Sequence, residues 1–259
     1  GVVAFHGKVA LVTGGASGMG RIAALQLAAL GAKVAIVALN DDNLASVSAE
    51  HANLTPFKCD TSDLAQVQQV VADVEANIGA IDRLTHCAAI MPGQSIKDMS
   101  AEATNKMMAI NYGGTVNMVK TVWPLMEARG SGDIIMFGSM AGDVLTHNLG
   151  AYSATKSATN TWAEVMIHEN KASPIRFMLV CPPMVKTPLV DQAMQNGPGS
   201  IKTAGDKQYV SPEFIIDAVE KAIEKGEWVV RPGSAKTMVR LRRFFPALLW
   251  KIMEKANGV

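Results

Sequence analysis

Short apolar runs alternate with amphipathic stretches along most of the 259-residue chain. Residues 8–13 (KVALVT) are apolar on both faces, which is typical of a strand buried in a parallel sheet. Residues 19–30 show helical spacing, and Gly31 is placed to end that helix. The same reading predicts further strands at 33–38, 54–59, 81–89, 132–138, 174–181 and 227–230. It predicts further helices near 41–50, 62–78, 100–129, 150–170 and 211–225.

Two details refine these elements. Asp41 or Asp42 is expected to cap the second helix, and Asp63 lies in the first turn of the third. Pro56 lacks an N–H group, so its strand is expected at an edge of the sheet. The alternation predicts an α/β, doubly wound parallel sheet of about seven strands, in the order 3-2-1-4-5-6-7, with helices on both faces.

We expect a single domain over residues 1–233 and a helical tail of the same domain over 234–259. Residues 190–210 break the pattern with Gly197, Pro198, Gly199 and Gly205. They are expected to form a loop over the site, and the alternative is a surface insertion.

Composition excludes several classes of protein. Hydrophobic residues make up 49% and the net charge is +1, so neither a disordered chain nor a nucleic-acid-binding protein is indicated. The three cysteines lie far apart without metal-ligand spacing, so no metal site is expected and a reduced compartment is favoured. We see no signal peptide and no long uncharged apolar run, and we expect a cytoplasmic protein.

A glycine-rich turn follows the first strand. Gly14, Gly18 and Gly20 stand between that strand and an alanine-rich helix. Without side chains, the backbone of such a turn lets a pyrophosphate approach the N-terminus of the helix. A second strand about 20 residues on completes the pattern of a dinucleotide site, against the alternative of a plain tight turn.

A second set of residues indicates proton transfer. Tyr152 and Lys156 are four residues apart, so they share one face of a helix, and Ser139 ends a predicted strand thirteen residues earlier. A free tyrosine has a pKa near about 10. A nearby ammonium group and a positive nicotinamide are expected to lower the pKa of Tyr152 toward the working range.

The T-G-x-x-x-G-x-G turn and the Ser-Tyr-Lys set together resemble the short-chain dehydrogenase/reductase family, over about residues 5–230. The resemblance implies a Rossmann-type fold and hydride transfer to or from a nicotinamide. It implies that Tyr152 is the general acid/base, Ser139 binds the substrate oxygen, and Lys156 holds the nicotinamide ribose. Asn111 matches the asparagine that orders a water in the proton relay. The alternative is that Asn111 kinks a helix by bonding to backbone, and both roles can coexist.

The resemblance also implies a set of cofactor contacts. The second strand ends in Ala38, then Leu39 and Asn40, where an acidic residue would select NAD and a basic one NADP. Asp41 and Asp42 lie near and no arginine does, so NAD is expected and NADP is the alternative. Asp60 resembles the adenine-contacting aspartate, unless it only caps a helix. The implied cofactor-binding residues are Gly14, Ser17, Gly18, Met19, Gly20, Ala38, Leu39, Asp60, Thr61, Cys87, Ala88, Ala89, Tyr152, Lys156, Pro182, Val185 and Thr187.

The chain departs from the family pattern elsewhere as well. An N-N-A-G segment reads His86-Cys87-Ala88-Ala89 here, and His86 is expected to be structural rather than catalytic. A P-G segment reads Pro182-Pro183, which stiffens the backbone there.

The residues expected around the substrate are mostly apolar and rich in methionine, which adapts to irregular shapes. They suit a bulky apolar alcohol or ketone, although several could simply pack the loop, and a carboxylate or CoA-linked substrate is less favoured. The set is Met91, Ser139, Met140, Leu145, His147, Leu149, Met184, Leu189, Val190 and Met194.

The tail joins basic residues (Arg240, Arg242, Arg243) to a run of apolar ones from Phe244 to Met253, with a break at Pro246. It is expected to pack on a subunit neighbour, which would give a homodimer or homotetramer, or on its own domain. The alternative is a peripheral contact with a membrane. For the whole chain we expect an NAD(P)-dependent oxidoreductase that interconverts a secondary alcohol and a ketone. The alternatives are an NADPH-dependent carbonyl reductase and a catalytically retired nucleotide-binding sensor or scaffold.

Overall fold

A parallel β-sheet forms the centre of the molecule. In this computed structural model, which describes residues 4–194 and 209–259, the sheet has seven strands in the order β3-β2-β1-β4-β5-β6-β7. Every neighbouring pair is parallel, as the sequence predicted. The strands are β1 (Val9–Thr13), β2 (Lys33–Ala38), β3 (Leu54–Lys58), β4 (Arg83–His86), β5 (Gly132–Phe137), β6 (Ile175–Val180) and β7 (Val229–Val230).

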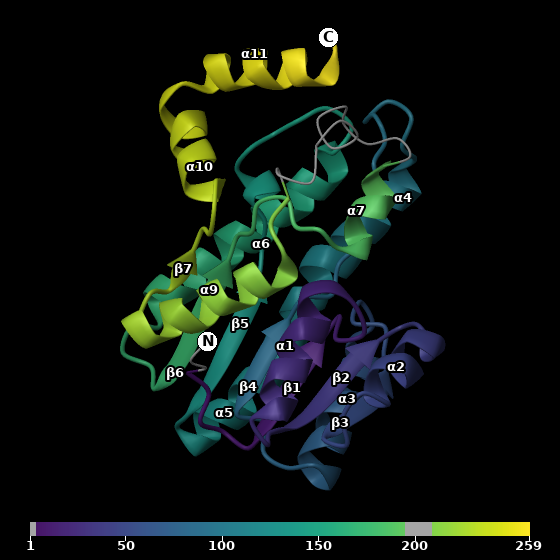
Figure 1. The fold of residues 1–259 in the computed structure, drawn as a ribbon, viewed down its shortest axis with the longest axis vertical. Coiled ribbons are helices and arrows are strands. Elements are labelled where there is room, and N and C mark those ends of the chain that lie inside the picture. The colour runs from purple at the N-terminus through teal and green to yellow at the C-terminus, as the bar shows by residue number, and fades with distance from the viewer. Residues whose placement is uncertain (1–3, 195–208) are drawn as a thin grey trace.

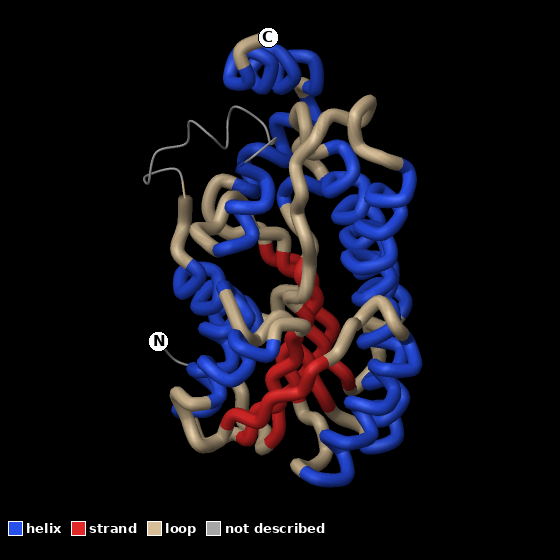
Figure 2. Tube along the Cα trace, turned by 90° about the vertical axis from the view of Figure 1, so that its right-hand side faces the viewer, coloured by secondary structure: helices blue, strands red, loops and turns tan. Residues whose placement is uncertain are grey.

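Helices cover both faces of this sheet (Figures 1 and 2). The apolar cluster on one face joins the strands to α3 (Leu64–Asn77), α5 (Gly114–Arg129) and α6 (Gly150–Glu169). Clusters on the other face join them to α1 (Gly18–Ala29), α2 (Asp41–Ser48) and α9 (Pro212–Lys225). The doubly wound arrangement therefore follows from strands that are buried on both sides.

The other elements lie near the carboxyl ends of the strands or beyond them. They are α4 (Ala101–Met108), a π-helical turn (Ala109–Gly113), a 3₁₀ turn (Met140–Gly142), α7 (Pro188–Met194), α10 (Ala235–Phe244) and α11 (Pro246–Asn257). None of the helices in the described ranges is long and apolar enough to cross a bilayer.

The amino ends of β4 and β5 are tied to α9 by buried charges. Arg83 is almost fully buried and pairs with Asp133 and, at 2.5 Å, with Glu220. Glu220 also accepts a hydrogen bond from the backbone N–H of Ala4. Because a buried charge is tolerated only when it is paired, these contacts fix the chain's start and α9 against the sheet. They lie at the opposite end of the strands from the glycine-rich turn.

Several local predictions are confirmed and others are corrected. β3, which contains Pro56, is an edge strand as predicted. The cap of α2 is Asn40, whose side chain accepts from the N–H of Asn43 at 2.9 Å, so the prediction of Asp41 or Asp42 was wrong. Asn40 is the N-cap because it has extended backbone angles and lies one residue before the helix.

Two longer segments also differ from prediction. The helix predicted over 100–129 is interrupted by the π-helical turn, which separates α4 from α5. The loop predicted over 190–210 begins as helix, because α7 continues to Met194. The rest of that prediction, residues 195–208, lies outside the described residues.

The tail forms two helices that break at Pro246, as predicted, and they sit at one end of the molecule (Figure 1). Leu249 is buried, the Trp250 ring packs edge-on against His147, and Asn257 donates to Thr146 at 2.9 Å. One face of the tail is therefore packed on its own domain.

Candidate functional site

A groove runs along the carboxyl ends of β1 to β6. Its first part has a volume of about 270 Å³ and lies at the carboxyl ends of the neighbouring strands β1 and β4, where the strand order reverses. In doubly wound sheets, ligands bind at this switch point. All the cofactor residues expected from the loops after β1 to β4 line it, together with Thr187; they are Gly14, Ser17, Gly18, Met19, Gly20, Ala38, Leu39, Asp60, Thr61, Cys87, Ala88 and Ala89.

The glycine-rich turn is shaped as the sequence predicted. Gly14 and Gly18 have positive φ angles of 64° and 54°, which favour glycine. A Cβ atom at Gly20 would lie 2.3 Å from the carbonyl oxygen of Gly14. Ser17 precedes α1 but makes no side-chain cap, so the first N–H groups of α1 face the groove without an intrahelical partner. This is the geometry that holds a phosphate at a helix N-terminus.

Thr13 joins the two strands beneath the groove. Its Oγ1 accepts from the N–H groups of Cys87 and Ala88, at 3.1 and 3.2 Å, and lies 2.7 Å from Nδ1 of His86. With both of those bonds accepted, the threonine hydroxyl proton is left to donate to His86. Burial lowers the pKa of His86 to about 3, so the ring is neutral. His86 and Cys87 thus support β1 and β4 by contacts of their own, and His86 does not reach the groove.

The end of β2 forms an open edge of the groove. We call Ala38, Leu39 and Asn40 the β2 rim; Leu39 and Asn40 are exposed. Lys58 next to this rim pairs with Asp41 at 2.9 Å. Among the described residues that line this first part of the groove, Asp60 is the one charged side chain.

Asp60 does not cap α3. Its carboxylate accepts from the N–H and hydroxyl of Ser62, at 3.0 and 2.7 Å, while Asp63 caps the helix. The helix-cap alternative for Asp60 is therefore wrong, and the side chain lines the groove.

The second part of the groove brings together the residues of the predicted proton-transfer site. We call Asn111, Ser139, Tyr152 and Lys156 the tyrosine cluster. Ser139 follows β5, whereas Tyr152 and Lys156 lie on one face of α6. Tyr152 and Lys156 are almost fully buried, and the lysine Nζ lies 5.9 Å from the centre of the tyrosine ring. Lys156 also donates to the carbonyl of Phe137 at 3.0 Å, which joins α6 to β5.

Asn111 is held by the π-helical turn, behind Tyr152. Its side-chain oxygen accepts from the N–H of Ile90 at 2.9 Å, and its Nδ2 donates to the Ile90 carbonyl and to Thr155 Oγ1 at 2.8 and 3.1 Å. Thr155 in turn donates to the carbonyl of Tyr152 at 2.7 Å. The structural reading of Asn111 therefore holds, since its amide links the loop after β4 to α6. A π-bulge is a common device for aiming a functional side chain.

Ser139 is positioned by Asn160, a residue that the sequence analysis missed. Asn160 donates from Nδ2 to the carbonyl of Ser139 at 3.0 Å and accepts from its N–H at 3.3 Å. Asn160 lies eight residues after Tyr152 on the same helix, and this spacing is the signal that could have found it.

The pKa values in the cluster follow burial. Burial raises the pKa of Tyr152 to about 12, and a hydrogen bond with Ser139 lowers it by less. Burial lowers the pKa of Lys156 to about 8. The sequence analysis expected the ammonium and a positive nicotinamide together to lower the pKa of Tyr152. In the polypeptide alone, burial outweighs the charge of Lys156.

A cavity of about 110 Å³ lies in front of the cluster. It continues into the first part of the groove, since Met19, Cys87, Ala89, Thr187 and Leu189 line both. The expected cofactor residues Pro182 and Val185 line it with Tyr152 and Lys156. So do seven of the expected substrate residues: Met91, Ser139, Met140, Leu149, Met184, Leu189 and Val190.

Three expected substrate residues do not join this set. Leu145 and His147 do not line the cavity, and His147 instead packs against Trp250 of α11. Met194 ends α7, and its side chain is not described. Sequence reasoning also missed five residues that complete the lining: Phe137, Gly138, Ala141, Pro183 and Tyr209. The first four flank the predicted motifs, so only adjacency could have suggested them. Tyr209 belongs to the segment 190–210 that was expected over the site.

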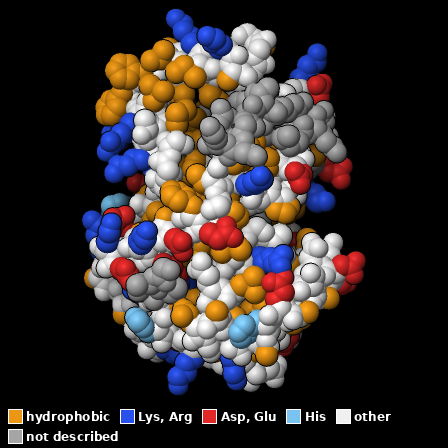
Figure 3. Space-filling model, in the orientation of Figure 1, with side chains coloured by type: hydrophobic (Ala, Val, Ile, Leu, Met, Phe, Trp, Pro, Cys, Tyr) orange, Lys and Arg blue, Asp and Glu red, His pale blue; other side chains and the backbone are white. Residues whose placement is uncertain are grey.

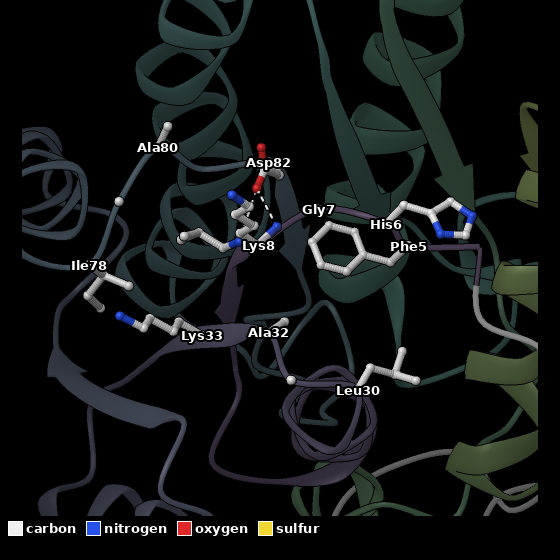
Figure 4. Close-up of a pocket in the computed structure, with 13 residues that line it drawn as sticks. Phe5, His6, Gly7, Lys8, Leu30, Ala32, Lys33, Ile78, Ala80 and Asp82 are labelled. Atoms are coloured by element: carbon white, nitrogen blue, oxygen red, sulfur yellow. Dashed lines mark hydrogen bonds between the residues drawn. The ribbon is translucent and has the colours of Figure 1, made fainter.

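A larger hollow, of about 800 Å³, lies at the other end of the sheet (Figure 4). Asp82 there accepts from the N–H groups of Lys8 and Val9, at 2.7 and 3.0 Å. This carboxylate satisfies backbone groups at the start of β1 and is not aimed into the hollow. No cluster of metal-binding side chains occurs in residues 4–194 or 209–259. Volume alone therefore does not identify the site, and the convergence of polar groups in the groove does.

Comparison with known proteins agrees with this geometry. The sequence model of the short chain dehydrogenase family matches residues 8–197. An uncharacterized oxidoreductase of Staphylococcus haemolyticus is 27% identical over 88% of this chain and 98% of its own. The 3-ketodihydrosphingosine reductase of Bos taurus is 27% identical over 99% of this chain and 80% of its own. A short chain dehydrogenase/reductase from Burkholderia phymatum, solved in complex with NAD, superimposes with a TM-score of 0.82 at 24% identity, over 95% of this chain and 96% of that one.

Proposed function

The chain belongs to the short chain dehydrogenase family, and we propose that it is an NAD-dependent oxidoreductase that interconverts a secondary alcohol and a ketone. The observation that carries this proposal is that half-buried Ser139 meets buried Tyr152 and Lys156 in a cavity that opens into the dinucleotide-shaped groove. Neither part of the groove would serve a hydride transfer without the other.

The polypeptide's own groups suit proton transfer at the substrate oxygen. The hydroxyls of Ser139 and Tyr152 face one cavity, so an alcohol oxygen placed between them can donate to Tyr152 and accept from Ser139. A bound nicotinamide would take up the hydride and, when oxidised, add positive charge beside the phenol. Because burial alone raises the tyrosine pKa to about 12, that added charge and the Lys156 ammonium are needed to favour the phenolate.

Lys156 and Asn111 are assigned supporting roles. Lys156 would donate to the nicotinamide ribose while it stays fixed to the Phe137 carbonyl. Asn111 uses both amide hydrogens within the protein, so its amide holds Ile90 and Thr155 in place and leaves one lone pair for the expected water. It therefore acts chiefly by positioning α6 beneath the substrate.

NAD is favoured over NADP by the charges around the groove. A 2′-phosphate needs a basic partner, and Asp60 is the one charged side chain among the described residues that line the first part of the groove. The expectation that no arginine lies near was wrong, because Arg21 lines a hollow together with Ser17 and Gly18 of the glycine-rich turn. Arg21 is paired with Glu50, however, and Lys58 with Asp41.

The substrate is expected to be apolar. Met91, Met140 and Met184 line the cavity with Leu149 and Leu189, and flexible methionines suit a bulky chain or ring. The bovine relative named above is a reductase of a keto compound, which agrees with ketone chemistry.

Replacement of Tyr152 by phenylalanine tests the proposal. NADH formation at 340 nm with a panel of apolar secondary alcohols should fall by at least about 100-fold, the usual contribution of general acid–base catalysis. Binding of NAD should be nearly unchanged. Tyr112→Phe is the matched control, because that ring packs on Trp162 and lies outside both cavities. Full turnover in Tyr152→Phe would refute the mechanism, and NAD binding without turnover on any alcohol or ketone would favour the retired sensor.

A further inference from the structure

The corner between α10 and α11 exposes a set of large apolar side chains. Phe244, Phe245 and Leu248 are 67%, 61% and 50% exposed, and Ile252 on α11 is also exposed. The opposite face of α11 is already used, since Leu249 is buried and Trp250 packs on His147. The space-filling view shows hydrophobic side chains gathered over this corner at the upper left (Figure 3). We call these four residues the apolar corner.

Positive charge is concentrated around the apolar corner. Residues 234–259 contain six Lys or Arg and a single Glu, so the other 233 residues hold 18 basic and 22 acidic ones. The tail is thus strongly positive on an otherwise slightly negative protein. Arg243 lies over the Phe244 ring, 5.8 Å from its centre, and basic side chains border the orange area in Figure 3.

We propose that the apolar corner and its basic border are a docking site for an anionic lipid bilayer surface. Exposed aromatic and aliphatic side chains beside Lys and Arg match the interface between acyl chains and anionic headgroups. A second copy of the chain fits less well. A two-fold contact through this surface would bring both sets of tail arginines together, and like charges at such a contact are destabilising.

The helix α11, which carries part of the docking site, also contacts the loop that borders the substrate cavity. Asn257 bonds to Thr146 and Trp250 packs on His147, while Leu149 of the same loop lines the cavity. If the proposed function holds, a bilayer bound at the apolar corner would therefore be separated from this loop by α11.

Vesicle sedimentation tests the docking site without any substrate. The full chain should bind phosphatidylcholine vesicles that contain phosphatidylglycerol, bind pure phosphatidylcholine weakly, and dissociate as salt is raised. The variant Arg240→Gln/Arg242→Gln/Arg243→Gln should lose affinity on the order of 100-fold. The control Lys171→Gln/Lys221→Gln/Lys225→Gln removes the same charge from exposed positions outside the tail and should lose far less.

A second pair of variants separates apolar insertion from charge. Phe244→Ser/Phe245→Ser should weaken vesicle binding by at least about tenfold, whereas Leu30→Ser/Val165→Ser, which changes two exposed apolar residues elsewhere, should not. Activity on a water-soluble ketone should stay unchanged in all four variants, so failure of the proposed function would be seen separately. The proposal is overturned if the full chain does not sediment with anionic vesicles. It is also overturned if light scattering shows that the full chain is a dimer and that Phe244→Ser/Phe245→Ser is a monomer.

Discussion

The tyrosine cluster and the β2 rim lie at two ends of one groove, yet they are built in opposite ways. Asn111, Tyr152 and Lys156 are buried, and each is held by contacts from another element. The β2 rim is largely exposed, and Asn40 is occupied with capping α2. Position is therefore fixed by contacts between distant elements at one end, and by the backbone and one local cap at the other. Substitutions should therefore lower activity strongly in the cluster and only slightly at the rim.

Replacement of Lys156 in the tyrosine cluster by methionine should cause the largest loss of activity. We expect kcat/KM to fall by at least about 100-fold, because the ammonium that favours the phenolate is gone. The folded state holds the lysine pKa at about 8, below its usual 10.5, so the buried charge opposes folding below pH 8 and this cost fades as pH rises to 10.5. The free energy of unfolding at pH 7 should accordingly stay level or rise.

The matched control for that experiment is Lys120→Met, an exposed lysine on α5. Initial rates of both variants give kcat/KM, and chemical denaturation gives their free energy of unfolding. If Lys156→Met lost much stability as well as activity, the lysine would act as a structural group and not as a buried charge that favours the phenolate.

Acid stability should depend on His86. The folded pKa is about 3 and the usual value is 6.5, so the unfolded chain takes up a proton as pH falls below 6.5 while the folded chain does not. This single group should lower the free energy of unfolding by about 2 kcal/mol between pH 7 and pH 5. Above pH 6.5 the neutral ring costs no stability, because it is then unprotonated in both states.

His86→Asn should remove that dependence, whatever its effect at pH 7. Asparagine can still accept from Thr13 but does not titrate. Urea denaturation from pH 5 to 7 measures the slope, with the exposed His6→Asn as control. An unchanged slope in His86→Asn would show that the buried ring is not the acid-sensitive group.

Thr155→Val tests whether the tyrosine cluster is positioned through its backing contacts. The substitution keeps the shape but removes the hydroxyl that joins Asn111 to the Tyr152 carbonyl. Turnover should fall by roughly tenfold, because small misplacements of reacting groups are costly. Thr159→Val, one turn on, removes only a bond to the Thr155 carbonyl and is the control. Both variants should lose about 1 kcal/mol of stability, so equal turnover in the two would leave Thr155 without a positioning role.

Much of the fold could be predicted because it depends on local periodicity. Short stretches of chain are enough to predict three features. These are the buried strands expected at 33–38 and 132–138, the glycines that need positive φ, and the i, i+4 spacing of Tyr152 and Lys156. The strand order then follows from the handedness of the crossovers.

What could not be predicted depends on distant partners. The π-helical turn at Asn111 is stabilised by Ile90 and Thr155, which come from other elements. His147 points toward Trp250 because the tail folds back over it, and no periodicity shows this. The raised pKa of Tyr152 likewise results from burial by the whole fold. Sequence therefore locates the motifs, whereas tertiary contacts set their orientation and acidity.

The last prediction concerns the β2 rim and changes the choice of cofactor rather than turnover. Native Ala38 offers no carboxylate to a ribose and no cation to a phosphate, so we expect NAD to be preferred while NADP is still used. Ala38→Asp should raise the NAD preference in kcat/KM by about tenfold, because the new carboxylate accepts from a ribose hydroxyl and repels a 2′-phosphate across a partly exposed surface. Ala38→Asn has the same shape without the charge and should shift the ratio much less. A strong native preference for NADP would support the carbonyl reductase alternative instead. Equal ratios in the two variants would mean that bulk, not charge, decides the choice, and that the rim is less permissive than its exposure indicates.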